Sequence, residues 1–170
     1  MPGDIEVVQR DGQPSLAIKV TAATFKLPMV MGKSYGKLMT YMQAKGIEMG
    51  GAPYTLYQDI DWAQAGQSKG LSAFIRMFTQ KWKMEIGVPV AVETAGEGEV
   101  VSALIPAGRY LKTLHRGPYS KVSEAYDRLM AHARSNNIRL GPYCLELYLN
   151  DPQTVPKQQL ETEVLVVLLD

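Results

Sequence analysis

The chain has 170 residues, of which 46% are hydrophobic and 21% charged, a composition that is ordinary for a globular protein with a substantial core. Its 18 Lys and Arg residues almost balance its 17 Asp and Glu residues, which argues against direct nucleic-acid binding. One cysteine excludes an internal disulfide. We recognise neither a signal segment nor an apolar run of membrane-spanning length, so we expect a cytoplasmic protein.

The first part of the chain predicts two strands and a long helix. Residues 5–10 and 16–20 are rich in strand-forming residues, and Asp11-Gly12 between them predicts an N-terminal β-hairpin. A helix should follow over residues 28–45, because proline is tolerated in a first turn and Gly46 can end the helix.

The next part predicts two strands with an insertion between them. The strands cover residues 54–59 and 82–90, and the second alternates apolar residues with charged or small ones. Residues 61–81 contain a predicted short helix, which would either close over a pocket as a lid or cover the core. The apolar face of this helix consists of Leu71, Phe74, Ile75 and Phe78.

Residues 94–98 are polar and contain glycine, so they are the best candidate for a joint between two halves. Beyond this joint the pattern predicts two strands, a helix and two strands, over residues 100–105, 109–115, 119–136, 143–149 and 160–169. Residues 164–169 are apolar at every position, which predicts a central strand covered on both faces.

The strand over residues 143–149 alternates strictly, so its leucines and its polar residues take opposite faces. We expect Leu145, Leu147 and Leu149 to be buried under the helices, and Glu146 to lie on the other face. A carboxylate placed there, next to a tyrosine, belongs either to a solvated surface or to the floor of a binding site.

The two parts of the chain repeat one pattern. Placing Tyr126 on Tyr35 also superposes, without a gap, Leu129 on Leu38, Ile138 on Ile47, Leu147 on Leu56 and Tyr148 on Tyr57. The alternative is chance agreement between two amphipathic helices that are each followed by a strand. The matching order of the elements favours duplication.

The repeat predicts an α+β fold. Two strand–helix–strand–strand units would pair edge to edge into one antiparallel sheet, with both helices on one face. We expect a single domain over residues 1–170, with one repeat over about residues 5–93 and the other over about residues 99–169.

Three short motifs carry a resemblance to a known family. They are His115-Arg116-Gly117-Pro118-Tyr119, the run of residues 145–152 (LELYLNDP) and residues 85–90 (EIGVPV). With them the chain resembles, over nearly its whole length, the GyrI-like small-molecule-binding family, which also supplies the effector-binding domains of multidrug-sensing transcription regulators. The resemblance implies a duplicated fold with a ligand cleft between the halves. It also implies a stand-alone module, because the chain has no room for the DNA-binding domain of the regulators.

The same resemblance implies a function. In ligand-sensing members a glutamate in the cleft meets cationic aromatic compounds, and Glu146 matches that position. Binding or sequestering a lipophilic, cationic or aromatic small molecule is therefore the first hypothesis. Some stand-alone members hydrolyse the strained cyclopropane rings of DNA-alkylating natural products with a glutamate and a tyrosine. A metal-independent hydrolase that uses Glu146 with Tyr148 or Tyr57 is the second hypothesis, and a topoisomerase-inhibiting module is the third.

Several further residues are candidates for ligand contact. Tyr57 and Tyr148 take equivalent places in the two halves and would face each other across the cleft; packing in the core is the alternative for each. The other candidates are Tyr119, Phe78, Trp82 and Glu85. Tyr119 would otherwise pack against a neighbouring strand, Trp82 would belong to the core, and Glu85 would be solvated. As a site residue, Glu85 should share a face with Glu146.

We expect no metal and no cofactor. His115 and His132 have no cysteine or carboxylate at ligand spacing, and the glycines fit no phosphate-binding loop. Cys144 is expected to be a small buried residue rather than a nucleophile, because no base stands beside it. The expected partner is a small molecule, without nucleic acid or membrane, and formation of a homodimer is left open.

Overall fold

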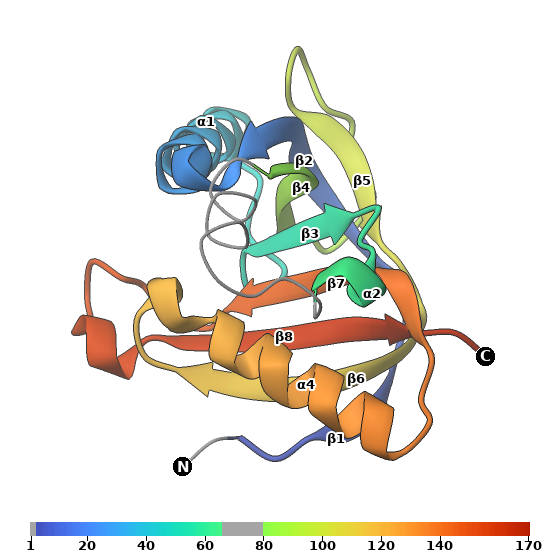
Figure 1. Ribbon diagram of the computed structural model, residues 1–170. Coiled ribbons are helices and arrows are strands. Elements are labelled where there is room, and N and C mark those ends of the chain that lie inside the picture. Colours follow the sequence, from blue (N-terminus) through green and yellow to red (C-terminus); the bar gives the residue numbers. More distant parts are fainter. Residues whose placement is uncertain (1–2, 66–79) are drawn as a thin grey trace.

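One antiparallel sheet organises the part of the chain that the structure describes, residues 3–65 and 80–170 of a computed structural model (Figure 1). Its strands are β1 (Glu6–Arg10), β2 (Gln13–Ala23), β3 (Tyr54–Gln58), β4 (Lys81–Pro89), β5 (Val101–Ile105), β6 (Gly108–Arg116), β7 (Leu140–Tyr148) and β8 (Glu161–Leu168). The strand order is β1-β6-β8-β7-β3-β4-β2-β5, and every neighbouring pair is antiparallel. The predicted α+β class is confirmed.

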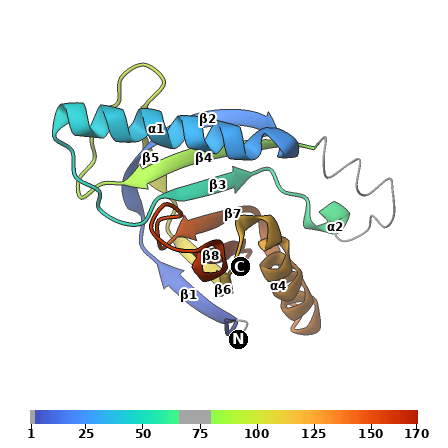
Figure 2. The same cartoon turned by 90° about the vertical axis from the view of Figure 1, so that its left-hand side faces the viewer.

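Two long helices lie on one face of this sheet. The helices are α1 (Leu27–Lys45), the short α2 (Trp62–Ala65) and α4 (Ser123–Ser135), with 3-10 turns at Thr24–Lys26, Tyr119–Lys121 and Lys157–Gln159. Helix α1 contacts β2 and β4, whereas α4 contacts β6 and β8, so each covers its own half of the sheet (Figure 2). No helix of the described residues is long and apolar enough to cross a membrane.

A residue in the left-handed backbone conformation follows each of the two long helices. Gly46, directly after α1, has φ of 65°, as predicted from its position. After α4 the left-handed residue is Asn137, with φ of 54°. The helix predicted in the insertion, with Leu71, Phe74, Ile75 and Phe78, lies outside the described residues.

The sheet is arranged as two matching halves. Each half consists of an edge strand, two inner strands and a central strand, in that order from the edge of the sheet. The central strand is β7 in one half and β3 in the other. These central strands pair with each other, and Thr55 lies directly opposite Glu146. In the superposition of the repeats Thr55 and Glu146 are equivalent positions. The pseudo-two-fold axis therefore passes between them, in the middle of the sheet.

The predicted N-terminal hairpin is wrong. Instead, β1 pairs with β6, and β2 pairs with β5. The pairs Arg10↔Gly108 and Gln13↔Ile105 show that both pairings have the same register, before and after Asp11-Gly12. Residues 6–17 thus run antiparallel to residues 101–112 as one bent ribbon that links the two halves. Asp11-Gly12 carries the chain from one half to the other, because pairing with the distant strand outweighs the local turn signal.

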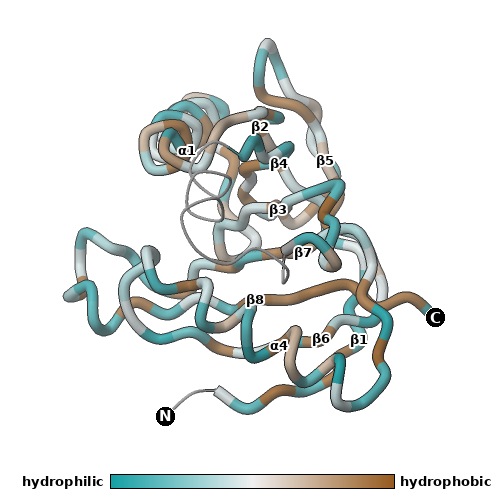
Figure 3. Tube along the Cα trace, viewed as in Figure 1, coloured by the Kyte–Doolittle hydropathy of each residue, from teal (hydrophilic) through white to brown (hydrophobic). Residues whose placement is uncertain are grey.

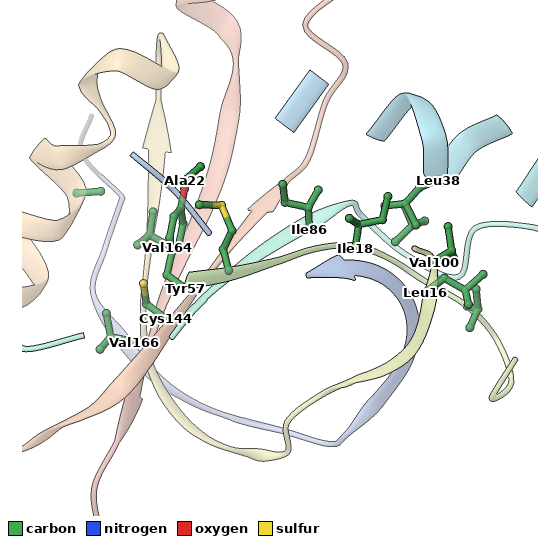
Figure 4. Packing of buried hydrophobic residues seen from close by; sticks show 14 of the residues in the cluster. Leu16, Ile18, Ala22, Leu38, Tyr57, Ile86, Val100, Cys144, Val164 and Val166 are labelled. Atoms are coloured by element: carbon green, nitrogen blue, oxygen red, sulfur yellow. The ribbon is translucent and has the colours of Figure 1, made fainter. Parts of the chain in front are cut away.

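The sheet curls and has a hydrophobic core on each face. The helix-side cluster lies between the sheet and the helices and includes Leu16, Ile18, Leu38, Met42, Tyr57, Met84, Ile86, Leu111, Leu129, Cys144, Val164 and Val166 (Figure 4). The inner cluster fills the curl and consists of Tyr54, Leu56, Ile105, Tyr110, Leu145, Leu147, Leu165 and Val167. Strand β8 contributes to both clusters, as predicted for a strand covered on both faces, and it is hydrophobic along most of its length (Figure 3).

The faces of β7 are the reverse of the prediction. Leu145 and Leu147 are buried in the inner cluster, away from the helices, and Leu149 is 43% exposed. Cys144 and Glu146 face the helices instead. The prediction failed because it assumed only one covered face, whereas curling of the sheet creates a second core that takes the leucines.

The inner cluster predicts different effects on stability for truncating Leu145, in β7, and Leu149, directly after it. Leu145→Ala should reduce the free energy of unfolding by about 2–5 kcal/mol, because it leaves a cavity in the inner cluster. Leu149→Ala, on the same face of the chain but exposed, should change it by less than about 1 kcal/mol. Urea denaturation of both variants measures the difference, and equal losses would contradict the assignment of the inner cluster.

Candidate functional site

Glu146 occupies the middle of the helix face, between the two halves of the sheet. Its side chain comes from β7, and the residue is only 6% exposed. The hydroxyl group of Tyr126, on α4, donates to Oε1 at 2.8 Å, and the hydroxyl group of Tyr148 donates to Oε2 at 2.9 Å. Both oxygens of the carboxylate are therefore held in a fixed orientation by phenols from two different elements.

Within residues 3–65 and 80–170, this carboxylate lacks a basic partner. Among residues 3–65 and 80–170, no Lys, Arg or His side chain forms an ion pair with Glu146. Burial raises its pKa above the ordinary value, and the hydrogen bonds from Tyr126 and Tyr148 offset only part of this effect. A buried acid with polar but uncharged partners results, which is unusual because buried charges are generally paired.

Hydroxyl groups connect Glu146 to the first half of the sheet. The hydroxyl of Tyr148 lies 3.0 Å from Oγ1 of Thr55 as well as 2.9 Å from Glu146, so its single proton serves one of these partners at a time. Thr55 in turn lies 3.4 Å from the hydroxyl of Tyr35, which donates to the carbonyl oxygen of Tyr54. The network crosses the seam between the repeats.

Aromatic rings surround this network, and we call them the aromatic cluster: Tyr35, Tyr57, Trp62, Trp82, Tyr119, Tyr126 and Tyr148. Tyr148 meets Tyr119 edge to face at 5.4 Å between ring centroids and Tyr35 at 6.2 Å. Trp82 meets Tyr57 edge to face at 5.7 Å, and Trp62 stacks on Tyr126 at 6.1 Å. Burial raises the pKa of Tyr57, Tyr126 and Tyr148 well above 10.0, so these phenols are uncharged at neutral pH. The surroundings of Glu146 are thus aromatic and neutral.

Most residues proposed from the sequence lie together in this region. Glu146, Tyr148 and Tyr119 are in contact, and Tyr57 and Trp82 form the neighbouring aromatic pair. Phe78 lies outside the described residues.

The expectation for Glu85 is wrong. It pairs with Leu56 of β3, and Leu56 belongs to the inner cluster, so Glu85 lies on the face opposite Glu146. There it is 3.7 Å from the ammonium group of Lys19. The error follows from the inverted faces of β7, because β4 itself has the expected orientation, with Met84 and Ile86 toward the helices.

Sequence reasoning missed four residues of the site, Tyr35, Thr55, Trp62 and Tyr126. A signal for two of them was present, because Tyr35 and Tyr126 are identical and equivalent in the repeats. Each reaches from its own helix to a central strand, Tyr35 to Thr55 and Tyr126 to Glu146. Trp62, whose indole N–H donates to the carbonyl of Gly141 at 2.7 Å, had no such signal.

Two other side chains of the region that could react, Cys144 and His115, have structural surroundings. Cys144 is buried, as predicted, and burial raises the pKa of its thiol well above the ordinary value. His115 makes a local contact, with Nε2 at 3.1 Å from the carbonyl oxygen of Pro118. No group of three or more His, Cys, Asp or Glu side chains suited to a metal ion occurs among the residues that the structure describes.

The raised pKa of Glu146 predicts how stability depends on pH. The folded protein holds this proton more tightly than the unfolded chain, so the contribution of Glu146 to stability is greatest below the unfolded pKa and is lost as pH rises through the folded pKa. Glu146→Gln should therefore gain stability relative to the wild type as pH rises over this interval. Thermal denaturation between pH 4 and pH 8 measures the difference.

Tyr148→Phe provides the opposite case. It removes a hydrogen bond that lowers the pKa of Glu146, so the loss of stability with rising pH should become larger. Parallel pH profiles for the wild type and both variants would show that Glu146 is not perturbed in this way.

Comparisons with known proteins agree with the fold. A family model described as the GyrI-like small molecule binding domain matches residues 5–168, whereas no curated protein matches the chain. The C-terminal domain of EcmrR is similar over 100% of this chain and 99% of its own, with a TM-score of 0.78 and 18% identity. Against the longer EcmrR chain of a DNA complex, this chain spans 57% of the length, with a TM-score of 0.77 and 18% identity.

Two further solved structures share the architecture. SAV2435 bound to tetraphenylphosphonium matches with a TM-score of 0.63 and 12% identity, over 98% of this chain and 94% of its own. A hydrolase from Listeria innocua matches with a TM-score of 0.62 and 9% identity, over 97% and 91%. At such identities these likenesses show the fold alone. The family model covers nearly the whole sequence, and the chain therefore belongs to the family of GyrI-like small-molecule-binding domains.

Proposed function

We propose that this chain binds a lipophilic organic cation against Glu146 and the aromatic cluster. The observation that carries the proposal is a buried carboxylate that has hydrogen-bond donors but no basic partner among the described residues. An organic cation supplies the missing positive charge, and the faces of tyrosine and tryptophan attract it by about 0.5–2 kcal/mol each.

The surroundings select against other ligands. A small inorganic cation would have to lose its hydration shell to approach a carboxylate that is only 6% exposed. An anion would be repelled by Glu146, and a neutral aromatic molecule would gain only the ring contacts. A cation whose charge is spread over apolar groups fits both the charge and the aromatic cluster. SAV2435, with the same fold, is bound to tetraphenylphosphonium, a compound of this class.

The charge role of Glu146 predicts a strong effect of Glu146→Gln. Binding of tetraphenylphosphonium should weaken by about 2–5 kcal/mol, because a desolvated charge pair loses one partner. Tetraphenylborate has the same shape with the opposite charge, so the wild type should bind it far more weakly, and the variant should discriminate less between the two ions. Isothermal titration calorimetry measures both affinities.

Glu85→Gln is the matched control. Glu85 is also buried, at 8% exposure, but it lies on the inner face beside Lys19. Its substitution should leave the affinity for tetraphenylphosphonium within about twofold of the wild type, since it makes no contact with the site. If both glutamine variants weakened the cation equally, the assigned role of Glu146 would be lost.

A second candidate function is hydrolysis of a strained ring, which the hydrogen bonds of Glu146 favour. A carboxylate with a raised pKa and two phenol hydroxyls at 2.8 and 2.9 Å is placed to accept a proton and pass it on. In opening a cyclopropane, Glu146 would take a proton from water as the oxygen of water bonds to one ring carbon. The bond from that carbon to a second ring carbon would break, and its electron pair would go to the second carbon. Tyr126 or Tyr148 would protonate the second carbon and recover a proton from Glu146.

Formation of the hydrated product from a cyclopropane-bearing aromatic substrate, followed by mass spectrometry, tests this second function. Glu146→Gln should slow it by at least about 10²-fold, as for loss of a general base. Tyr126→Phe and Tyr148→Phe, each tested alone, should identify the phenol, because these two hydroxyl groups donate to Glu146. Tyr57→Phe is the comparison, since it alters a tyrosine of the aromatic cluster whose hydroxyl group is not one of these two donors. If the protein bound the substrate but formed product no faster than buffer does, hydrolysis would be ruled out for this substrate, and the protein would only sequester it.

A further inference from the structure

The two halves of the helix face differ in polarity beside their equivalent tyrosines. Tyr57 pairs across strands with Met84, which pairs with Val20, so the row beside it is apolar. The corresponding row beside Tyr148 runs through Thr162 to His115. Equivalent places in the repeats thus hold a methionine and a valine in one half and two hydrogen-bonding side chains in the other.

The hydroxyl group of Thr162 has no hydrogen-bond partner within the part of the chain that the structure describes. Thr162 is fully buried, and its Oγ1 is one of two buried side-chain polar atoms without a hydrogen bond among the described residues. The other is Nε of Arg128, whose remaining nitrogens donate to the carbonyl oxygens of Leu114 and Glu124. Leaving a buried hydroxyl unpaired is unfavourable, and such exceptions in folded proteins call for a specific explanation.

The position of this hydroxyl relates it to the ligand site. Thr162 lies on the same face of the sheet as Tyr148, its direct neighbour on β7, and Tyr148 touches both Glu146 and Tyr119. Tyr119 is 38% exposed, so the ring that packs on Tyr148, the neighbour of Thr162, is in contact with solvent. His115, the neighbour on the other side, already directs Nε2 to Pro118.

We propose that Thr162 is a specificity-determining residue, whose hydroxyl group hydrogen-bonds a polar group on one ring of the bound cation. This inference rests on the proposed binding of a lipophilic cation at Glu146, and it narrows the ligand class. The ligand carries its positive charge and aromatic surface together with an oxygen or nitrogen that reaches past Tyr148. The apolar row beside Tyr57 accepts the part of the ligand that has no such group.

A pair of probes isolates this contact. Tetraphenylphosphonium and a triphenylphosphonium with one hydroxyphenyl ring have the same charge and nearly the same shape, and differ in one hydroxyl group. Thr162→Val, which is almost isosteric, should weaken the hydroxylated cation by about tenfold, the size of one good hydrogen bond, and change the affinity for tetraphenylphosphonium by less than about twofold. Thr162→Ser retains the hydroxyl and should bind both cations as the wild type does.

Thr113→Val is the matched control, because it removes a hydroxyl from the same face whose partner is known, the carbonyl oxygen of Gly3 at 2.9 Å. It should leave the ratio of the two affinities unchanged. If Thr162→Val weakened both cations equally or neither of them, Thr162 would not determine specificity, although binding of tetraphenylphosphonium by the wild type would still support the proposed function. If the wild type bound neither cation, both proposals would fall.

Discussion

The register between β3 and β7 is the constraint on which the site depends, because side chains of a strand alternate between its two faces. A slip of one residue at this seam would turn Glu146 toward the inner cluster and bring leucines under the helices. The observed pairing of Thr55 with Glu146 places equivalent residues of the repeats side by side. The halves therefore meet at one shared site instead of forming two. Burial of Leu145 and Leu147 on the opposite face opposes any slip.

Alternation and repetition were sufficient to predict the strands, the two long helices and their common face, because these features follow from local periodicity. Orientation did not follow. In β7 both sets of alternating residues are buried, so hydropathy alone does not distinguish the helix side from the inner side. The pairing of β1 was missed for a related reason. Asp11-Gly12 has the chemistry of a tight turn, but the partner of β1 is β6, about a hundred residues away along the chain.

For the candidate site, the sequence predicted the carboxylate but not all of the groups that hydrogen-bond to it. Glu146, Tyr148 and Tyr119 were predicted from motifs, and Tyr35 and Tyr126 were visible only as an identity between the repeats. Thr55 and Thr162 give no signal in sequence, because a threonine in a strand is ordinary. They belong to the candidate site because of the residue paired with each on the neighbouring strand, which is Glu146 for Thr55 and Tyr148 for Thr162. Such neighbours are set by register, which needs the folded sheet.

Divergence between the halves explains how a symmetric fold produces a polarised site. On the pseudo-two-fold axis one repeat supplies Thr55 and the other supplies Glu146. A single carboxylate therefore stands where exact symmetry would place two directly opposite each other, and two such charges would repel each other strongly. The free protein has already removed water from Glu146, which lowers the cost of bringing an apolar cation against it. Phenol hydroxyls orient the carboxylate but do not neutralise it, as Lys or Arg would. Under the proposed function, the bound cation supplies the opposite charge, and binding should therefore stabilise the fold.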